Sequence, residues 1–124
     1  MLEDTVNEWL SSFAATAIAA DLEAHMSHIS KSVKVYGIQG FDTVGYDDWH
    51  RQCSEEFPQK LIRELSYDDI TFSGGEDDTI LIKARERLET SEGKTQNHSL
   101  EMLLDKSEGP WLLKELRVLP EHQA

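Results

Sequence analysis

Residues 79–106 decide the fold of this chain, and they read TILIKARERLETSEGKTQNHSLEMLLDK. Apolar and polar side chains alternate on both sides of a short polar loop, which is the period-two pattern of β-strands. The pattern predicts strands over 79–90 and 95–106, joined by a hairpin loop at 91–93. The even-numbered residues from 80 to 88 and from 98 to 104 then share one face, which is apolar apart from Glu86 and His98.

The length of the loop sets the register of this hairpin. A three-residue loop places Thr90 opposite Lys94, and counting outward from that pair brings Glu86 opposite His98. Directly opposed residues of an antiparallel pair point to the same side, with Cβ atoms about 5 Å apart. The sequence therefore predicts that these two ionisable side chains are neighbours on an apolar face.

The predicted pair of Glu86 and His98 has two interpretations. Polar groups on a buried face need partners, so the two side chains can simply satisfy each other. A carboxylate that orients an imidazole is also the arrangement with which enzymes build a general acid or base. The sequence leaves both interpretations open.

A fifth strand is predicted over 111–119, but its facing is ambiguous. If Trp111 and Leu113 face the core, Glu115 and Arg117 do too; the alternative set of Leu112, Leu116 and Val118 turns them outward. Both sets contain apolar residues, so the pattern does not decide.

The first half of the chain predicts helices that cover this sheet. Apolar residues at helical spacing predict helices over 2–19, 21–28 and 46–57, the first with a capping box at Thr5 and Glu8. Strands are predicted over 32–38 and over 61–73, the second bent near 66–69, with loops at 37–45 and 74–78.

The predicted helices and antiparallel strands make the fold class α+β. Length and composition indicate one globular domain over 1–124, with 39% hydrophobic residues, and no apolar run is long enough to cross a bilayer. Acidic residues near the N-terminus and a single cysteine, Cys53, predict a cytoplasmic protein without disulfides; Cys53 itself is expected to be an inert core thiol. The net charge of −12 and the scattered basic residues argue against nucleic-acid binding.

No cofactor or metal is predicted. His25 and His28 lie three residues apart on a predicted helix, but a metal site needs three or four converging ligands, so both are interpreted as partly exposed polar residues. The glycines after the first predicted strand lack the Lys-Ser/Thr of a phosphate-binding loop.

The order of these elements resembles the nuclear-transport-factor-two-like superfamily, the cystatin-like, cone-shaped rolls that include ketosteroid isomerase and the polyketide cyclases of the SnoaL type. The resemblance rests on four short stretches: Ala20-Asp21-Leu22, 33–37 (VKVYG), 45–49 (GYDDW) and 109–113 (GPWLL). It implies a mixed, largely antiparallel curved sheet under N-terminal helices, and a ligand site inside the cone. By this resemblance, the position of the isomerase's hydrogen-bonding Tyr is Phe13, that of its base is Gly37 beside Tyr36, and that of its second oxyanion donor falls near His98. The first two positions lack the required chemistry, so isomerisation of ketosteroids is disfavoured.

Two functions are expected from this resemblance. The first is a ligand-binding or assembly domain that forms a homodimer through the outer sheet face, where Leu81 and Leu103 lie among charged residues. The second is a cofactor-independent acid–base enzyme (isomerase, dehydratase or cyclase) acting on a small apolar molecule with His98, Glu86 and Tyr36. The residues expected to contact the ligand are Trp9, Phe13, Trp49, Ala84, Leu100, Met102 and Arg117.

Overall fold

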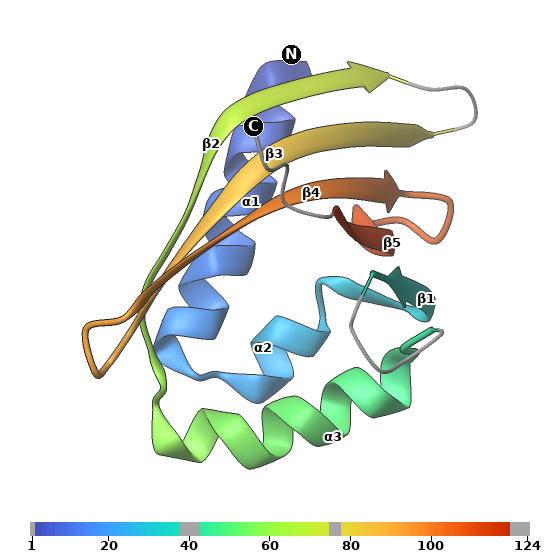
Figure 1. The fold of residues 1–124 in the computed structure, drawn as a ribbon. Coiled ribbons are helices and arrows are strands. Elements are labelled where there is room, and N and C mark those ends of the chain that lie inside the picture. The colour runs from blue at the N-terminus through green and yellow to red at the C-terminus, as the bar shows by residue number, and fades with distance from the viewer. Residues whose placement is uncertain (1, 38–42, 75–77, 120–124) are drawn as a thin grey trace.

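A computed structural model describes residues 2–37, 43–74 and 78–119 of the chain (Figure 1). The loop positions 38–42 and 75–77, expected above to be turns, lie outside the described residues. The elements in chain order are α1 (Leu2–Ala19), α2 (Leu22–Met26), β1 (Ile29–Tyr36), α3 (Tyr46–Glu56), the 3₁₀ turn η1 (Phe57–Gln59), β2 (Ile62–Gly74), β3 (Thr79–Thr90), β4 (Thr95–Asp105) and β5 (Leu112–Leu119).

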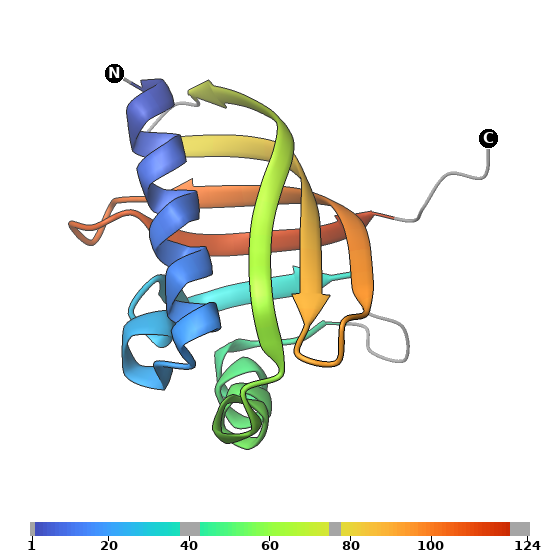
Figure 2. The same ribbon diagram turned by 90° about the vertical axis from the view of Figure 1, so that its left-hand side faces the viewer.

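The strands of the described residues form one mixed sheet in the order β1-β5-β4-β3-β2. Strands β1 and β5 pair in parallel, and the other neighbouring strands pair antiparallel. The sheet is strongly curved, and the three helices lie on its concave side (Figures 1 and 2). The α+β architecture predicted from the sequence is therefore confirmed. No helix of the described residues is long and apolar enough to span a bilayer.

Most element boundaries agree with the sequence prediction to within three residues, but the predicted capping box is wrong. Helix α1 begins at Leu2, so Thr5 and Glu8 lie inside it and do not flank its start. Asp21 is the N-cap of α2, where its carboxylate accepts a hydrogen bond from the backbone N–H of Ala24 at 3.2 Å.

The hairpin register predicted from loop length is confirmed. Strands β3 and β4 pair without a shift along their whole length, and Glu86 is opposite His98. The inward residues between them form the centre of the core: Ile80, Ile82, Met102 and Leu104 are at most 1% exposed. Helix α1 covers this face with its own buried row, which contains Val6, Trp9, Leu10 and Phe13.

A β-bulge resolves the ambiguous facing of β5. Leu104 pairs with Leu113 but Leu103 pairs with Glu115, so Lys114 is an extra residue in the strand. Because the bulge reverses parity, Leu113 before it faces the core and so do Leu116 and Val118 after it, opposite Met102 and Leu100. Both apolar sets proposed from the sequence are thus partly right, while Glu115 and Arg117 face outward.

Candidate functional site

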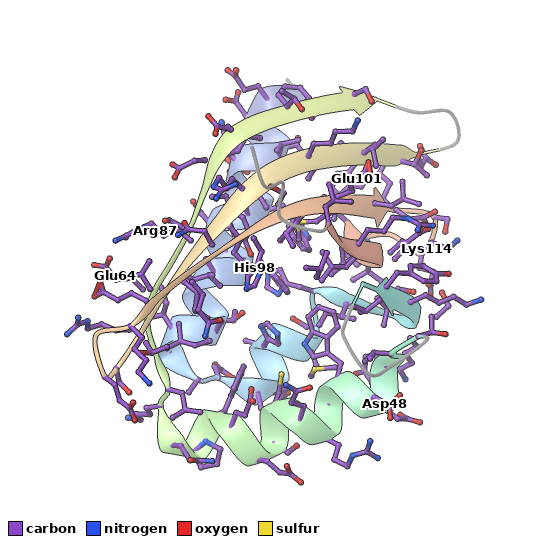
Figure 3. The ribbon with its side chains drawn as sticks, in the orientation of Figure 1. Asp48, Glu64, Arg87, His98, Glu101 and Lys114 are labelled. Carbon is purple, nitrogen blue, oxygen red and sulfur yellow. The ribbon has the colours of Figure 1, made fainter. Side chains whose placement is uncertain are left out.

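An acidic, a phenolic and an imidazole side chain meet on the concave face of the sheet. Glu86 of β3 is flanked by Tyr67 of β2 and by His98 of β4, each directly opposite it in the register. The Tyr67 hydroxyl donates a hydrogen bond to Oε2 of Glu86 at 3.0 Å. Figure 3 shows His98 pointing toward the helices, whereas Arg87 and Glu64 point away from them. The structure therefore brings the predicted pair together and adds Tyr67 to it.

Burial controls the electrostatics of this cluster. Removal from water raises the pKa of Glu86, and the Tyr67 hydrogen bond and nearby His98 offset the rise only in part. Burial and the adjacent carboxylate raise the pKa of the Tyr67 hydroxyl well above its ordinary value, so Tyr67 stays protonated. A carboxyl group with a raised pKa can act as a proton donor closer to neutral pH than an ordinary one.

Exposure increases along the inward face toward the end of the hairpin. Ala84 and Leu100 are 7% and 3% exposed, whereas Glu86 and His98 are half-buried and Gln96 is exposed. The cluster of Tyr67, Glu86 and His98 therefore lies where the packed core gives way to solvent.

The side chains of Tyr36 and Arg117 do not join this cluster. They are opposite each other on β1 and β5, and the guanidinium of Arg117 lies 4.5 Å from the centre of the Tyr36 ring. Arg117 also forms an ion pair with Glu115 at 2.8 Å on the outer face of the sheet. Tyr36 was expected beside Glu86 and His98, and Arg117 was expected inside the cone. The structure places both elsewhere, because Val35 and Leu116 occupy the inward positions of β1 and β5.

The apolar residues expected to line a ligand site form part of the packed core. Trp9, Phe13, Ala84, Leu100 and Met102 are all at most 7% exposed, and the rings of Trp9 and Phe13 stack at 4.8 Å. Trp49 is half-buried, and its indole N–H is bonded to a second polar cluster.

This second cluster centres on His25. The indole N–H of Trp49 donates to Nε2 of His25 at 3.1 Å, so the ring proton lies on Nδ1, which faces the Thr16 hydroxyl at 3.1 Å. Thr16 in turn donates to the carbonyl oxygen of Phe13 at 2.7 Å. Burial, with a smaller contribution from His28, lowers the pKa of His25 to about 4. Every polar atom of the imidazole is thus satisfied in the neutral form.

The interpretation of His25 as partly exposed is wrong: it is 5% exposed and stacks on Phe13 at 4.8 Å, and only His28 is half-buried. His28 instead contacts the Ser12 hydroxyl and the Ala24 carbonyl, both at 2.8 Å. Among the described residues no group of three or more His, Cys, Asp or Glu side chains has a metal-binding arrangement. Burial raises the pKa of the Cys53 thiol to about 11, as expected for an inert core cysteine.

The backbone also constrains the position that corresponds to the isomerase base. Gly37 has φ +87°, and a Cβ placed on it would lie 2.1 Å from the carbonyl oxygen of Val118. No side chain fits there without moving β5, so this position cannot carry a catalytic carboxylate in the present backbone.

Open grooves on the surface of the described residues include the following three. One of about 640 Å³ lies between α2, α3, the start of β1 and the turn before β5, and another of about 400 Å³ adjoins it at Lys31 and Tyr46. The third, about 440 Å³, lies between α1 and β2 and includes Tyr67. None of the three is lined by Glu86 or His98.

Comparisons with known proteins agree with this architecture. No protein-family model matches the chain, and no curated protein matches its sequence. Among solved structures, an NTF2-like protein from Cytophaga hutchinsonii superposes with a TM-score of 0.81 at 11% identity, covering 96% of this chain and 98% of the other. An NTF-2 like protein of unknown function from Shewanella oneidensis MR-1 gives 0.79 at 17% identity, covering 95% and 98%.

A candidate dehydratase of the NTF2-like family from Streptomyces avermitilis gives a TM-score of 0.72 at 14% identity and covers 97% of this chain and 96% of that one. At these identities the likeness concerns fold, and it is maintained over nearly the whole of each chain. The chain therefore has the NTF2-like, cystatin-like fold, which is the fold that the resemblance of its sequence implies.

Proposed function

We propose that this chain is a small-molecule-binding domain whose polar anchor is the cluster of Tyr67, Glu86 and His98. The observation that supports it is a carboxyl group with a raised pKa, held by a phenol at 3.0 Å at the solvent-facing edge of the apolar concave face. A ligand with an apolar body and a neutral acceptor, such as a ketone, suits this combination: the body covers core side chains and the acceptor takes a proton or hydrogen bond from Glu86 or His98.

The test is a titration with 2-cyclohexenone followed by amide NMR shifts. Saturable shifts are expected at Tyr67, Glu86 and His98, and His98→Ala weakens binding about fivefold, the worth of one hydrogen bond near 1 kcal/mol. Asn97→Ala is the matched control, since it alters the neighbouring exposed residue on the opposite face of β4. Absence of saturable shifts at these three residues up to about 10 mM ligand would refute the proposed site.

A catalytic function is a second candidate, favoured by the same raised pKa of Glu86. A carboxyl group beside a phenol and an imidazole has the parts of an acid–base catalyst, and a candidate dehydratase shares the fold. Running the same titration in D₂O discriminates the two functions. Catalysis requires exchange of the carbon-bound protons next to the ketone that is faster than in buffer and is lost in Glu86→Gln; binding alone requires shifts without exchange.

Self-association through the outer sheet face is the remaining part of the proposal. Leu81 and Leu103 are directly opposite each other there, and Leu81 is 37% exposed. Charged residues surround the pair, including the 3.9 Å contact of Lys83 with Glu101. An apolar centre inside a charged rim is the usual anatomy of an interface between proteins. Sedimentation is expected to show a homodimer at micromolar concentration, and a monomer would contradict the proposal.

A further inference from the structure

A groove lies between helix α1 and the edge strand β2, which run side by side in Figure 2, and its floor includes the buried residues Leu10 and Ala14. One wall consists of the face of α1 that contains Asn7, Ser11, Ala14, Ala15 and Ile18, and the other of the edge strand β2 near Tyr67 and Ile70. Its volume of about 440 Å³ falls in the range of roughly 300–1,000 Å³ that small-molecule sites occupy.

The lining of this groove is uncharged. The chain contains 24 acidic and 12 basic residues, yet none of them lines this groove. Each of the other two grooves is lined by carboxylates and by Lys31. Apolar surface also remains open to solvent here, since Ile18 is 40% exposed. An uncharged, partly apolar concavity on a protein with net charge −12 favours a neutral ligand over an ion.

Polar contacts are available at one end of the groove. The side chains of Asn7 and Ser11 are one helical turn apart on α1, and neither forms a hydrogen bond with another residue that the structure describes. An amide and a hydroxyl can each donate and accept, so they suit an alcohol or a carbonyl on the ligand.

From these features we infer that the groove between α1 and β2 is a second binding site, which takes a neutral, largely apolar small molecule with a single hydroxyl or carbonyl group. The site is separate from the cluster around His98, and the two have only Tyr67 in common: Tyr67 lines the groove and donates to Glu86. A ligand in the groove therefore contacts a residue that also holds the Glu86 carboxyl group.

The test uses 2-naphthol as the probe and amide NMR shifts as the measurement. Saturable shifts are expected at Ala14, Ala15 and Tyr67. Ala15→Glu, which adds a charge and bulk to an exposed lining position, is expected to weaken binding at least tenfold. Ala19→Glu adds the same charge to the same helix outside the groove and leaves the affinity within twofold of wild type.

Four outcomes would overturn the inference. The first is the absence of saturable shifts at the groove, and the second is equal binding of the anion 2-naphthalenesulfonate. The third is binding that survives Ala15→Glu but is lost in His98→Ala, and the fourth is groove shifts that depend on protein concentration without probe, which would assign the groove to a second copy of the chain. The third outcome would leave the proposed site around His98 standing. Conversely, failure of 2-cyclohexenone to shift Glu86 and His98 would not affect the result with 2-naphthol.

Discussion

Acidification is expected to destabilise this fold through one side chain, His25. His25 lies on α2, and its imidazole links this helix to two others. It stacks on Phe13 of α1 and faces the hydroxyl of Thr16, also of α1, and it accepts a hydrogen bond from Trp49 of α3. Protonation of Nε2 would place a proton where the indole N–H already points, and it would put a charge in a site that is 5% exposed. The folded state therefore resists protonation of His25, whereas the unfolded chain does not.

The size of the effect follows from the two pKa values. The pKa of His25 is about 4 in the folded protein against an ordinary value of 6.5. A pKa that differs by 1 between the folded and unfolded states corresponds to about 1.4 kcal/mol of stability, so the full effect is about 3 kcal/mol. Because the folded pKa is the lower one, this stability is fully present above pH 6.5 and is lost as the pH falls toward 4. At pH 5 the loss is about 2 kcal/mol.

Urea unfolding at pH 7.5 and pH 5, followed by circular dichroism, measures this loss. His25→Gln is the informative variant, since an amide can still accept from Trp49 and donate to Thr16 but does not titrate. The difference in unfolding free energy, wild type minus His25→Gln, should be about 2 kcal/mol smaller at pH 5 than at pH 7.5. His50→Gln, on the exposed side of α3, should leave the corresponding difference unchanged. A wild-type minus His25→Gln difference that is the same at both pH values would refute the assignment of a strongly lowered pKa to His25.

Two further predictions concern the backbone and the outer face. Gly37→Ala should cost about 2–4 kcal/mol of unfolding free energy, because its Cβ meets the carbonyl oxygen of Val118; Gly93→Ala, at a similar φ of +89° but with open space around it, should cost about 1 kcal/mol, and equal costs would contradict the clash. Leu81→Arg should convert the proposed dimer to a monomer in sedimentation experiments, whereas Leu61→Arg, at a residue with similar exposure outside the sheet, should not.

The central hairpin could be predicted from the sequence because two independent signals agree there. Residues 80–88 and 98–104 alternate without interruption, and the loop between the strands has a length that permits only one parity. The pairing of Glu86 with His98 follows from these two facts alone. The boundaries of the long helices followed likewise from uninterrupted apolar periodicity, with Leu2 and Ala19 as the observed limits of α1.

Side chains that depend on contacts between distant elements could not be predicted in this way. No neighbour of His25 in the sequence indicates that its side chain is buried. It is buried because Phe13, Trp49 and Phe57 contact it from α1, α3 and η1. The outward facing of Arg117 depends on the extra residue Lys114 in β5, and a bulge of this kind leaves the composition of the strand almost unchanged.

The candidate site depends on a second bulge of the same type. In β2, Asp68 pairs with Arg85 and Thr71 pairs with Lys83, so two residues of β2 lie opposite one of β3, and Asp69 adopts φ +52°. Phe72 beyond the bulge faces the core, and in an unbroken strand Tyr67 would then face outward. The bulge reverses the parity and turns the Tyr67 hydroxyl toward Glu86. The hydrogen bond that holds the carboxyl group is therefore set by an irregularity in the edge strand, and alternation alone predicts Glu86 and His98 but not their third partner.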